Sequence, residues 1–311
     1  MKVPPLKDLP DLPPEIVQAG PNGHLVLFVG AGVSMLLDLP SWASFARKVL
    51  EDLQKAELLD FSELDQLESL PPRTQLSIAI RIAKENGNDL DLRKYFTGPA
   101  EGQSIYRTIN DIGCTCVTTN YDELLSPRFL DTTTEPSATS REPIRVYARG
   151  DLVVRRLDEP GVVVHLHGAI SDPNSMVVTT KDYLDHYDQE IVQTFLHDLF
   201  KRKIVLFLGY GLSENEILEH ILRRGSVEDQ DTGDRRRFVL QGFFRSQEPL
   251  YQKLYEYYRV SFGLHLIGFI RDYKDYKQQE AIIKSWAREI RVNKPALADD
   301  YARMRGILDA S

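Results

Sequence analysis

The chain of 311 residues contains only two cysteines, and this scarcity excludes several kinds of scaffold and site. Cys114 and Cys116 are separated by one residue, which in a strand puts both side chains on one face but too far apart for an easy disulfide. A structural zinc site needs about four Cys or His ligands, and a second Cys pair is missing. We therefore expect two small buried side chains in a core strand, in a protein of a reducing cytoplasm.

Long hydrophobic runs are missing as well, and the N-terminus lacks the features of a signal peptide. The run "IVLFLGYGL" (204–212) falls far short of the roughly 18 residues that a membrane-spanning helix needs. The opening "MKVPPLKDLPDLPPEIVQAG" is rich in proline and of mixed charge, without the apolar centre of a secretion signal. These features predict a soluble, cytoplasmic protein that makes no contact with membranes.

An excess of positive charge is also lacking. The chain has 38 lysines and arginines against 46 aspartates and glutamates, which gives a net charge of −8. This balance argues against direct nucleic-acid binding as the main activity, because proteins with that activity carry basic surfaces. The hydrophobic fraction of 42% is ordinary for a globular protein, and the length allows one large α/β domain or two smaller ones.

Apolar strands alternate with amphipathic helices along most of the chain. This alternation is typical of a doubly wound, Rossmann-like α/β fold, in which helices cover both faces of a parallel sheet. The expected strands are 24–30, 114–120, 144–149, 161–170, 204–211, 237–244 and 264–270. The expected helices are 14–20, 41–59, 179–203, 213–224, 247–259 and 276–290.

The region between about 41 and 110 has a helical pattern without a strand. We expect it to form a helical insertion over the carboxyl ends of the strands, where such sheets bind ligands, with Ser41 as the N-cap of its first helix. The expected organisation is an N-terminal arm (1–13), one catalytic domain that contains the insertion (14–294), and a C-terminal helical tail (295–311).

Four short polar or glycine-rich stretches each follow an apolar strand, so a parallel sheet should bring them to one crevice. They are "GAGVS" (30–34), "TTNYD" (118–122), "HLHG" (165–168) and "GYGLSENE" (209–216). In the first, Gly30 and Gly32 permit a tight turn and let backbone amides approach a pyrophosphate, helped by the start of the following helix. Ser34 adds a hydroxyl. A close strand-to-helix junction that binds nothing has the same pattern.

The second and third stretches add side chains with more chemistry. Asn120 can hold a ribose or nicotinamide group or orient a water, and Asp122 lies beside it. Asp122 and Tyr121 are equally suited to cap a helix that begins at "ELL". The two histidines of HLHG should share one face of the strand. His167 suits a general base near neutral pH, His165 suits a packed neighbour, and too few further ligands are present for a metal site.

The fourth stretch is a second glycine-rich turn after a buried strand. Gly209, Gly211 and Ser213 are candidates to border a phosphate or ribose, and Glu214 or Asn215 could bind sugar hydroxyls. A structural turn in which Ser213 is the N-cap of the next helix explains the same residues.

Together and in this order, the four stretches resemble the motifs of the sirtuin superfamily (silent information regulator two-like), over roughly residues 20–225. The matching positions are Gly30, Ala31, Gly32 and Ser34 for the Gly-Ala-Gly-x-Ser motif, Asn120 and Asp122 for Asn-x-Asp, His167 for the histidine before glycine, and 209–213 for the later glycine-rich strand end.

The resemblance implies that the domain binds NAD⁺ and cleaves the bond between nicotinamide and ribose. In the family, the Gly-Ala-Gly loop holds the pyrophosphate, the Asn and Asp hold ribose and nicotinamide, and the His acts as the base. Asn120 and His167 are thus the implied catalytic residues. The implied binding residues for NAD⁺ are Gly30, Ala31, Gly32, Ser34, Asp122, Gly209, Gly211 and Ser213.

The chain departs from the deacetylating sirtuins in its zinc module. Those proteins carry two Cys pairs, whereas the region between TTNYD and HLHG contains no cysteine. They also read Gln-Asn-Ile-Asp where this chain has the residues 119–122, Thr-Asn-Tyr-Asp. We therefore expect no metal, and a closer likeness to the zinc-free bacterial branch that is associated with antiphage defence and hydrolyses NAD⁺ to nicotinamide and ADP-ribose.

The leading hypothesis is a NAD⁺ glycohydrolase (an NAD⁺ nucleosidase) that serves as a regulated, NAD-depleting effector in bacterial antiphage defence. The alternatives are a NAD-dependent protein deacylase, which the missing zinc module disfavours, and a non-catalytic sensor of NAD⁺ or ADP-ribose, which the presence of both Asn120 and His167 disfavours. Cyclisation of ADP-ribose in place of hydrolysis stays open.

Unrestrained NAD⁺ hydrolysis would be toxic, so the leading hypothesis also predicts regulation. We expect a homo-oligomer, or a separate partner protein such as an ATPase, a nuclease or a sensor. The arm (1–13) and the tail (295–311) are the candidate docking elements, and packing of each on its own domain is the equal alternative.

Overall fold

The computed structural model describes residues 3–88, 90–97, 104–127, 144–147, 149–159, 161–211 and 235–290. The expected helix over 213–224 and the expected tail over 295–311 lie outside these residues. Within the described ranges, none of the helices combines the length and apolar character needed to cross a bilayer.

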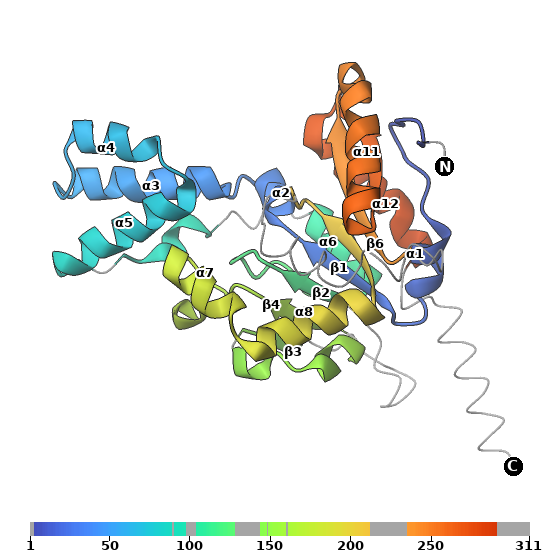
Figure 1. Cartoon of the computed structure of the whole chain (residues 1–311), viewed down its shortest axis with the longest axis horizontal. Coiled ribbons are helices and arrows are strands. Elements are labelled where there is room, and N and C mark those ends of the chain that lie inside the picture. The colour runs from blue at the N-terminus through green and yellow to red at the C-terminus, as the bar shows by residue number, and fades with distance from the viewer. Residues whose placement is uncertain are drawn as a thin grey trace, which may run out of the picture.

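The core of the fold is a sheet of seven parallel strands in the order β3-β4-β2-β1-β5-β6-β7 (Figure 1). The strands are β1 (Leu25–Val29), β2 (Thr115–Thr118), β3 (Ile144–Val146), β4 (Val162–His165), β5 (Ile204–Leu208), β6 (Arg237–Phe243) and β7 (Leu264–Ile270). Each lies within one of the seven predicted strand regions. The predicted Rossmann-like α/β fold is therefore confirmed, and β1, which is apolar at all five positions, takes the central place and is buried throughout.

The strand order reverses at β1, which pairs with β2 on one side and with β5 on the other. Val29 is in register with both Thr118 and Leu208, so these three strands end at one level. Thr118 is in turn level with His165 at the end of β4. The segments that carry the four motifs therefore emerge side by side, at the switch point where open α/β sheets bind ligands.

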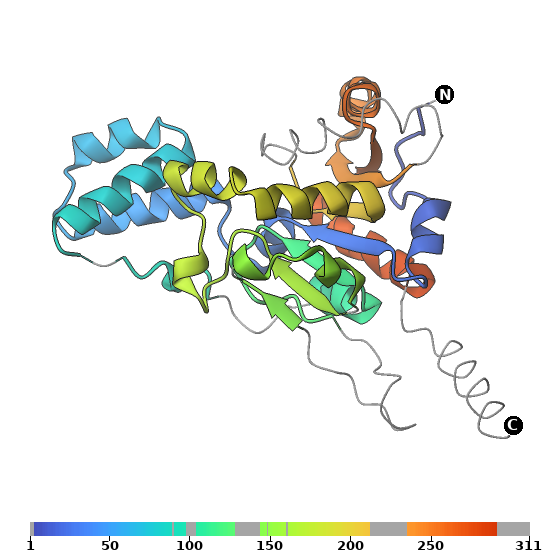
Figure 2. The same ribbon diagram turned by 60° about the horizontal axis from the view of Figure 1, so that its bottom comes forward.

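Helices cover both faces of the sheet. They are α1 (Pro14–Ala19), α6 (Ser104–Ile112), α8 (Glu190–Arg202), α11 (Glu248–Phe262) and α12 (Gln278–Ile290). Helices α8 and α11 pack on one face through a cluster that includes Phe195 and Tyr251. Helices α1, α6 and α12 pack on the other face through a cluster that includes Ile16, Ile109 and Trp286. Figure 2 shows α8 lying along its face of the sheet.

The predicted helix over 179–203 is divided in the structure. α7 (Thr180–Tyr187) ends at a short break, and α8 begins after Gln189. Thr179 starts α7 with a capping box, because its hydroxyl accepts from the Asp182 backbone N–H at 3.1 Å and the Asp182 carboxylate accepts from the Thr179 N–H at 2.8 Å. The break lets α7 contact α5 while α8 stays on the sheet.

Helices α3 (Trp42–Lys55), α4 (Phe61–Glu68) and α5 (Pro72–Glu85) form a helical lobe that projects to one side of the sheet (Figure 1). The lobe encloses its own hydrophobic cluster, which includes Phe45 and Leu76. Ser41 caps α3 as predicted, since its hydroxyl accepts from the Ser44 backbone N–H. α6 falls within the same helical region of the sequence, yet its apolar residues belong to the cluster on the sheet.

The described part of the N-terminal arm, residues 3–13, packs on its own domain. The Ile270 backbone N–H donates to the carbonyl of Lys7 at 2.9 Å, and the Trp286 indole N–H donates to the carbonyl of Pro10 at 3.1 Å. These bonds attach the arm to β7 and α12. The arm therefore covers part of an edge strand whose backbone groups would otherwise be open to pairing with another chain.

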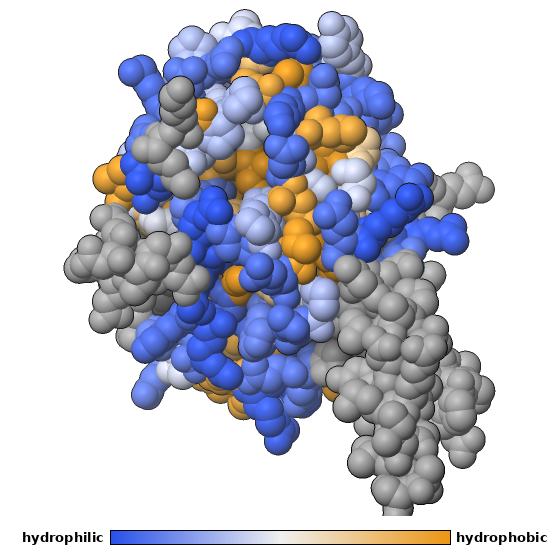
Figure 3. All heavy atoms as spheres, turned by 90° about the vertical axis from the view of Figure 1, so that its right-hand side faces the viewer, coloured by the Kyte–Doolittle hydropathy of each residue, from blue (hydrophilic) through white to orange (hydrophobic). Residues whose placement is uncertain are grey.

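The side of the molecule that carries the arm and α11 is mixed in character (Figure 3). Hydrophobic residues reach the surface there between hydrophilic ones. Leu9 of the arm and Leu250 and Tyr257 of α11 are each about half exposed. Single exposed apolar side chains are ordinary in folded proteins, so they assign no function to this face.

The loops after β1 and β5 pack backbone against backbone. The Gly32 N–H donates to the carbonyl of Gly209 at 2.8 Å. A Cβ atom on Gly32 would lie 2.7 Å from that oxygen, and one on Gly209 would lie 2.4 Å from the Val33 nitrogen. Gly209 also has a φ of +61°, which side chains disfavour. Part of the glycine pattern is thus explained by contact between two loops of the protein itself.

We expect Gly209→Ala to destabilise the fold more than Gly87→Ala, a matched control. Both glycines have a positive φ, but nothing lies within 4 Å of a Cβ built on Gly87. The free energy of unfolding of the control should fall by about 1–2 kcal/mol, because alanine disfavours this backbone conformation. Gly209→Ala should lower the free energy of unfolding by roughly 1–3 kcal/mol more, because the added methyl clashes with the loop after β1. Urea unfolding measures both values, and equal losses would show that the two loops are free to separate.

Candidate functional site

A cavity of about 770 Å³ opens at the carboxyl ends of the strands, beside the lobe. Its volume is in the range of small-molecule binding sites. The predicted site residues that line it are Ala31, Gly32, Ser34, Asn120, Asp122, His167, Gly209 and Gly211. Gly30 lies just behind the wall, where a Cβ would meet Tyr210 and Gly209. Ser213 lies outside the described residues.

The GAGVS motif starts a helix of a single turn, α2 (Ala31–Ser34), which continues into the 3₁₀ turn η1 (Met35–Leu37). The chain then passes through Asp38, with φ of 60°, before α3 begins at Trp42 and enters the lobe. The helix that was expected to attract a pyrophosphate is therefore very short. Its contribution would come from individual backbone N–H groups rather than from a long helix dipole.

Asn120, Asp122 and Ser34 meet in a buried hydrogen-bonded network. The Nδ2 atom of Asn120 donates to the carbonyl of Gly30 at 3.1 Å and to Ser34 Oγ at 2.8 Å. Ser34 Oγ donates to Asp122 Oδ2 at 2.7 Å. The Asn120 backbone N–H donates to Thr118 Oγ1 at 3.0 Å, which holds the turn at the end of β2. The network therefore ties the loop after β1 to the loop after β2.

Tyr106 of α6 completes this network, and the sequence analysis did not identify it. Its hydroxyl oxygen lies 2.8 Å from Ser34 Oγ and 3.4 Å from Asn120 Nδ2. In the sequence, Tyr106 occupies an apolar position of an amphipathic helix and so looks like any core aromatic residue. Nothing in its local pattern signals the hydroxyl's partners, because they belong to two loops distant in the chain.

The network is buried, and this affects its ionisable groups. Burial raises the pKa of Asp122, although Ser34, the Leu124 backbone and Tyr106 oppose the rise. Burial, followed by the charge of Asp122, raises the pKa of Tyr106 well above its usual value. Tyr106 therefore keeps its proton at any physiological pH and can act as a donor in the network.

The alternative role of Asp122 as a helix cap is wrong. Residues 122–127 form no helix, so nothing begins at "ELL" for Asp122 or Tyr121 to cap. Asp122 Oδ1 instead accepts from the Leu124 backbone N–H at 3.3 Å, in a local turn typical of aspartate. Its second oxygen faces Ser34 in the network.

His167 lies in the turn after β4, and α7 encloses its ring. The Tyr187 hydroxyl lies 2.7 Å from Nε2, and the Tyr183 hydroxyl lies 3.3 Å from Nδ1. His167 is only 1% exposed. Burial lowers its pKa well below the usual value, and His186 and Arg73 add to the effect. The imidazole is therefore neutral at neutral pH, which is the form that accepts a proton.

The prediction that His165 and His167 share one face of a strand is wrong. β4 ends at His165, and the chain turns before His167, so the alternation of a strand does not continue. The His165 ring packs against Tyr147 with centroids 5.1 Å apart, and its Nδ1 lies 3.4 Å from the carbonyl oxygen of Asn120. Burial lowers the pKa of His165 to about 4. His165 is a packed neighbour of the site.

The loop after β5 forms another wall of the cavity through Gly209 and Gly211. The ring of Tyr210, between the two glycines, packs edge-on against Phe28 of β1 with centroids 5.3 Å apart. Glu214 and Asn215, which were candidates to bind sugar hydroxyls, lie outside the described residues together with Ser213.

The remaining walls come from side chains that the sequence analysis left unassigned. The lobe region contributes Trp42, Phe45, Arg73 and Phe96, and the ends of β6 and β7 contribute Gln241, Lys274 and Lys277. The guanidinium carbon of Arg73 lies 3.7 Å from the centre of the Tyr183 ring, a cation–π contact between the lobe and α7. The lobe side of the cavity is thus largely aromatic, whereas the opposite side is more polar and also carries Asp275, Tyr276 and Gln279.

The cysteines are free and buried, as predicted, but only Cys116 lies in the strand β2, since Cys114 comes just before it. Over the described ranges, no group of three or more His, Cys, Asp or Glu side chains is arranged to hold a metal ion.

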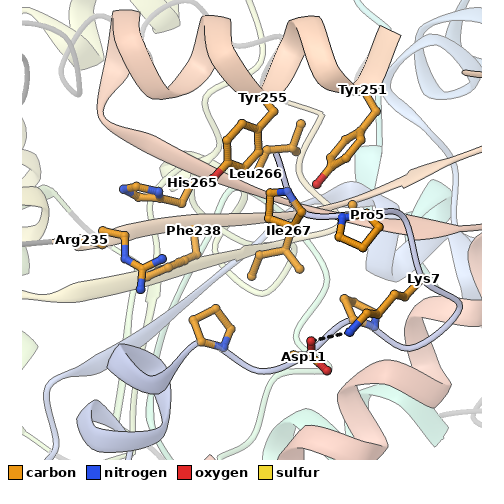
Figure 4. Close-up of a pocket in the computed structure, with 14 residues that line it drawn as sticks. Pro5, Lys7, Asp11, Arg235, Phe238, Tyr251, Tyr255, His265, Leu266 and Ile267 are labelled. Atoms are coloured by element: carbon orange, nitrogen blue, oxygen red, sulfur yellow. Dashed lines mark hydrogen bonds and ion pairs between the residues drawn. The ribbon is translucent and has the colours of Figure 1, made fainter. Parts of the chain in front are cut away.

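A second hollow, of about 200 Å³, lies between the arm, α11 and the neighbouring parts of β6 and β7 (Figure 4). Its charged side chains are already paired, Lys7 with Asp11 and Arg235 with Glu15. None of the four motifs contributes to its lining. The cavity at the switch point is therefore the candidate functional site.

The buried histidines predict that the fold loses stability in acid. The pKa of His165 is about 4 in the folded state, against about 6.5 in an unfolded chain. The unfolded chain therefore binds the proton first, so stability is complete above pH 6.5 and is lost as the pH falls toward 4. At pH 5.5 this one group should reduce the free energy of unfolding by about 1 kcal/mol. His167 should contribute in the same direction.

Urea unfolding between pH 7.5 and 5.5 measures this loss. His265→Gln removes a third histidine, at a less buried position, whose pKa burial also lowers to about 4. The variant should flatten the pH dependence without removing it. A free energy of unfolding that stays constant over this interval would contradict the prediction.

Part of the chain is similar to a known family of domains. A family model described as "SIR2-like domain" matches residues 115–262, a stretch that contains Asn120, His167 and Gly209. The chain is also 26% identical, over 209 residues, to "Defense-associated sirtuin 2" of Bacillus subtilis. That alignment covers 65% of this chain and 19% of the relative, so the chain spans about a fifth of the relative's length. The all-parallel Rossmann-like sheet and the match over 115–262 agree with the resemblance drawn from the sequence, and the chain is similar to SIR2-like domains.

Proposed function

We propose that the domain is a NAD⁺ glycohydrolase, which cleaves NAD⁺ to nicotinamide and ADP-ribose. The observation that carries the proposal is that Asn120 and His167 line one cavity with the Gly-Ala-Gly loop, at the switch point of the sheet. The similarity to a SIR2-like domain supports NAD⁺ as the substrate.

The cavity contains side chains suited to the cleavage reaction. Loss of nicotinamide leaves positive charge on the ribose, so the site must hold the leaving group, stabilise that charge and admit a water. The amide hydrogens of Asn120 are used on Gly30 and Ser34. Its Oδ1 is then the polar atom that can accept from the attacking water or from the nicotinamide amide. Asp122, when ionised, adds negative charge nearby in a medium of low dielectric.

We propose that His167 accepts the proton that leaves the attacking water. As water bonds to C1′ of the ribose and the bond to the nicotinamide nitrogen breaks, one proton must leave the water. A neutral imidazole has one donor and one acceptor nitrogen, and each nitrogen here contacts a tyrosine hydroxyl. Proton uptake therefore requires one hydroxyl to turn away. Tyr183 fits this movement because its contact is the longer one and it lines the cavity.

The rest of the dinucleotide would lie across the ends of β1, β5 and β6. The backbone of residues 31–34 would hold the pyrophosphate, as in other strand-to-helix turns that bind phosphates. The adenosine half would then extend past Gly211 toward Gln241 and Lys277, which line the far side of the cavity.

We further propose a regulated, NAD-depleting role in antiphage defence. The support is the similarity to a relative whose name assigns it to defence. This chain spans about a fifth of that relative, so the similarity does not assign the activity or the partners of the whole relative to this chain. Restraint of a toxic activity would come from assembly into a homo-oligomer, or from a separate ATPase, nuclease or sensor protein.

Asn120→Ala and His167→Ala should each reduce nicotinamide release from NAD⁺ by roughly 10²–10⁴-fold, because each removes a group that acts in the transition state. Purified protein, alone and as an assembled complex, is incubated with NAD⁺, and products are separated by chromatography. His265→Ala is the matched control, since it removes a histidine that burial also keeps neutral but that lies in the second hollow. The control should keep the wild-type rate.

Three outcomes would count against the proposal. Release of nicotinamide that survives both substitutions would remove the site assignment. NAD-dependent deacylation of peptides without release of nicotinamide in water alone would favour a deacylase. Tight binding of NAD⁺ or ADP-ribose with no turnover in any assembly state would favour a sensor.

A further inference from the structure

Tyr106 is a buried tyrosine whose hydroxyl has no counterpart in the family motifs described above. It is 1% exposed and lies on α6, beneath the cavity rather than in its wall. Its ring packs in the hydrophobic cluster between α6, α12 and the sheet. Packing alone would be served equally well by phenylalanine, so the hydroxyl needs a separate explanation.

The hydrogens of the network leave one consistent assignment when Asp122 is ionised. The single hydrogen of Ser34 goes to Asp122 Oδ2. One lone pair of Ser34 Oγ accepts from Asn120 Nδ2. The remaining contact, to Tyr106 at 2.8 Å, must then be a bond that Tyr106 donates to the second lone pair of Ser34. Ser34 Oγ thus has three partners and is fully satisfied.

This arrangement restricts how the Asn120 amide can lie. Its Nδ2 faces the Gly30 carbonyl and the oxygens of Ser34 and Tyr106, all of which accept hydrogen. A flipped amide would place Oδ1 against the Gly30 carbonyl, where two acceptors repel and no hydrogen is shared. The hydroxyl of Tyr106 strengthens the preference because it saturates Ser34 and adds an acceptor on the same side.

We propose that Tyr106 is a positioning residue for the reaction, which holds Asn120 through Ser34 so that Oδ1 of the amide faces the bound substrate. The proposal rests on the glycohydrolase function proposed above. It predicts that loss of the hydroxyl affects the chemical step more than substrate binding, because Tyr106 touches no substrate and the cavity wall is unchanged.

Tyr106→Phe tests this role, with Tyr251→Phe as the matched control. Tyr251 is similarly buried, at 2% exposure, but lies on α11 beside the second hollow. We expect kcat for nicotinamide release to fall about 10- to 100-fold in Tyr106→Phe while KM for NAD⁺ changes less than about threefold. The control should keep both constants. Circular dichroism and urea unfolding establish that each variant is folded.

The pH profile supplies a readout that a packing role would not move. The groups that act on Asp122 come from α2 (Ser34), α6 (Tyr106) and its own loop (the Leu124 backbone), and Tyr106 is the titratable one among them. The bond from Ser34 to Asp122, which Tyr106 holds in place, lowers the pKa of Asp122, so removal of the Tyr106 hydroxyl should raise that pKa. The acid limb of kcat/KM should therefore move to higher pH in Tyr106→Phe and stay in place in the control.

A crystal structure of Tyr106→Phe and calorimetry with a non-hydrolysable NAD⁺ analogue separate this proposal from the proposed function. An inactive wild-type protein would refute the glycohydrolase, whereas the position of the Asn120 side chain and its hydrogen-bond partners in the variant can still be determined. Tyr106→Phe with wild-type kcat and an unmoved pH profile would overturn the positioning role. So would a variant that loses analogue binding in proportion to activity, because the hydroxyl would then serve binding rather than chemistry.

Discussion

The site depends on one backbone contact, the hydrogen bond from the N–H of Gly32 to the carbonyl of Gly209. It joins the first turn after β1 to the turn after β5, with no room for a side chain on either glycine. Because β1 and β5 lie on the two sides of the switch point, this contact forms the floor from which the cavity opens. The packing of these two loops therefore requires the glycines of the motif, whether or not a ligand is bound.

Next to this contact, a small number of polar groups are buried. Ser34 bonds to Asn120, Asp122 and Tyr106 at once, so three separate segments of the chain converge on one hydroxyl. Burial makes each bond costly to break and favours a single arrangement of the network. His167 is held in a similar way by two tyrosines of α7, and α7 contacts the lobe through the stacking of Arg73 on Tyr183. The lobe is thereby linked physically to the histidine of the site.

Much of this arrangement was predictable from the sequence. Strands that are apolar at every position, such as 25–29, are typical of parallel sheets covered on both faces, and this led to the correct fold. The motifs then converge because parallel strands end at one edge. The predictions from sequence were wrong about local geometry where β4 stops at His165, where no helix follows Asp122, and where the helix over 179–203 is divided into α7 and α8. Each error extended a regular pattern past the point at which it ends in the structure.

By itself, the sequence determined the parallel α/β class of the fold, the burial of the cysteines and the set of motifs that meet at the switch point. These features follow from periodicity and from the direction of parallel strands. Only the tertiary structure decided which polar atoms face one another. Tyr106 enters the site through its hydroxyl, and Trp42 and Arg73 enter through the fold of the lobe. Hydrogen bonds join groups by their position in space, and neither residue type nor spacing along the chain encodes a contact between segments so far apart.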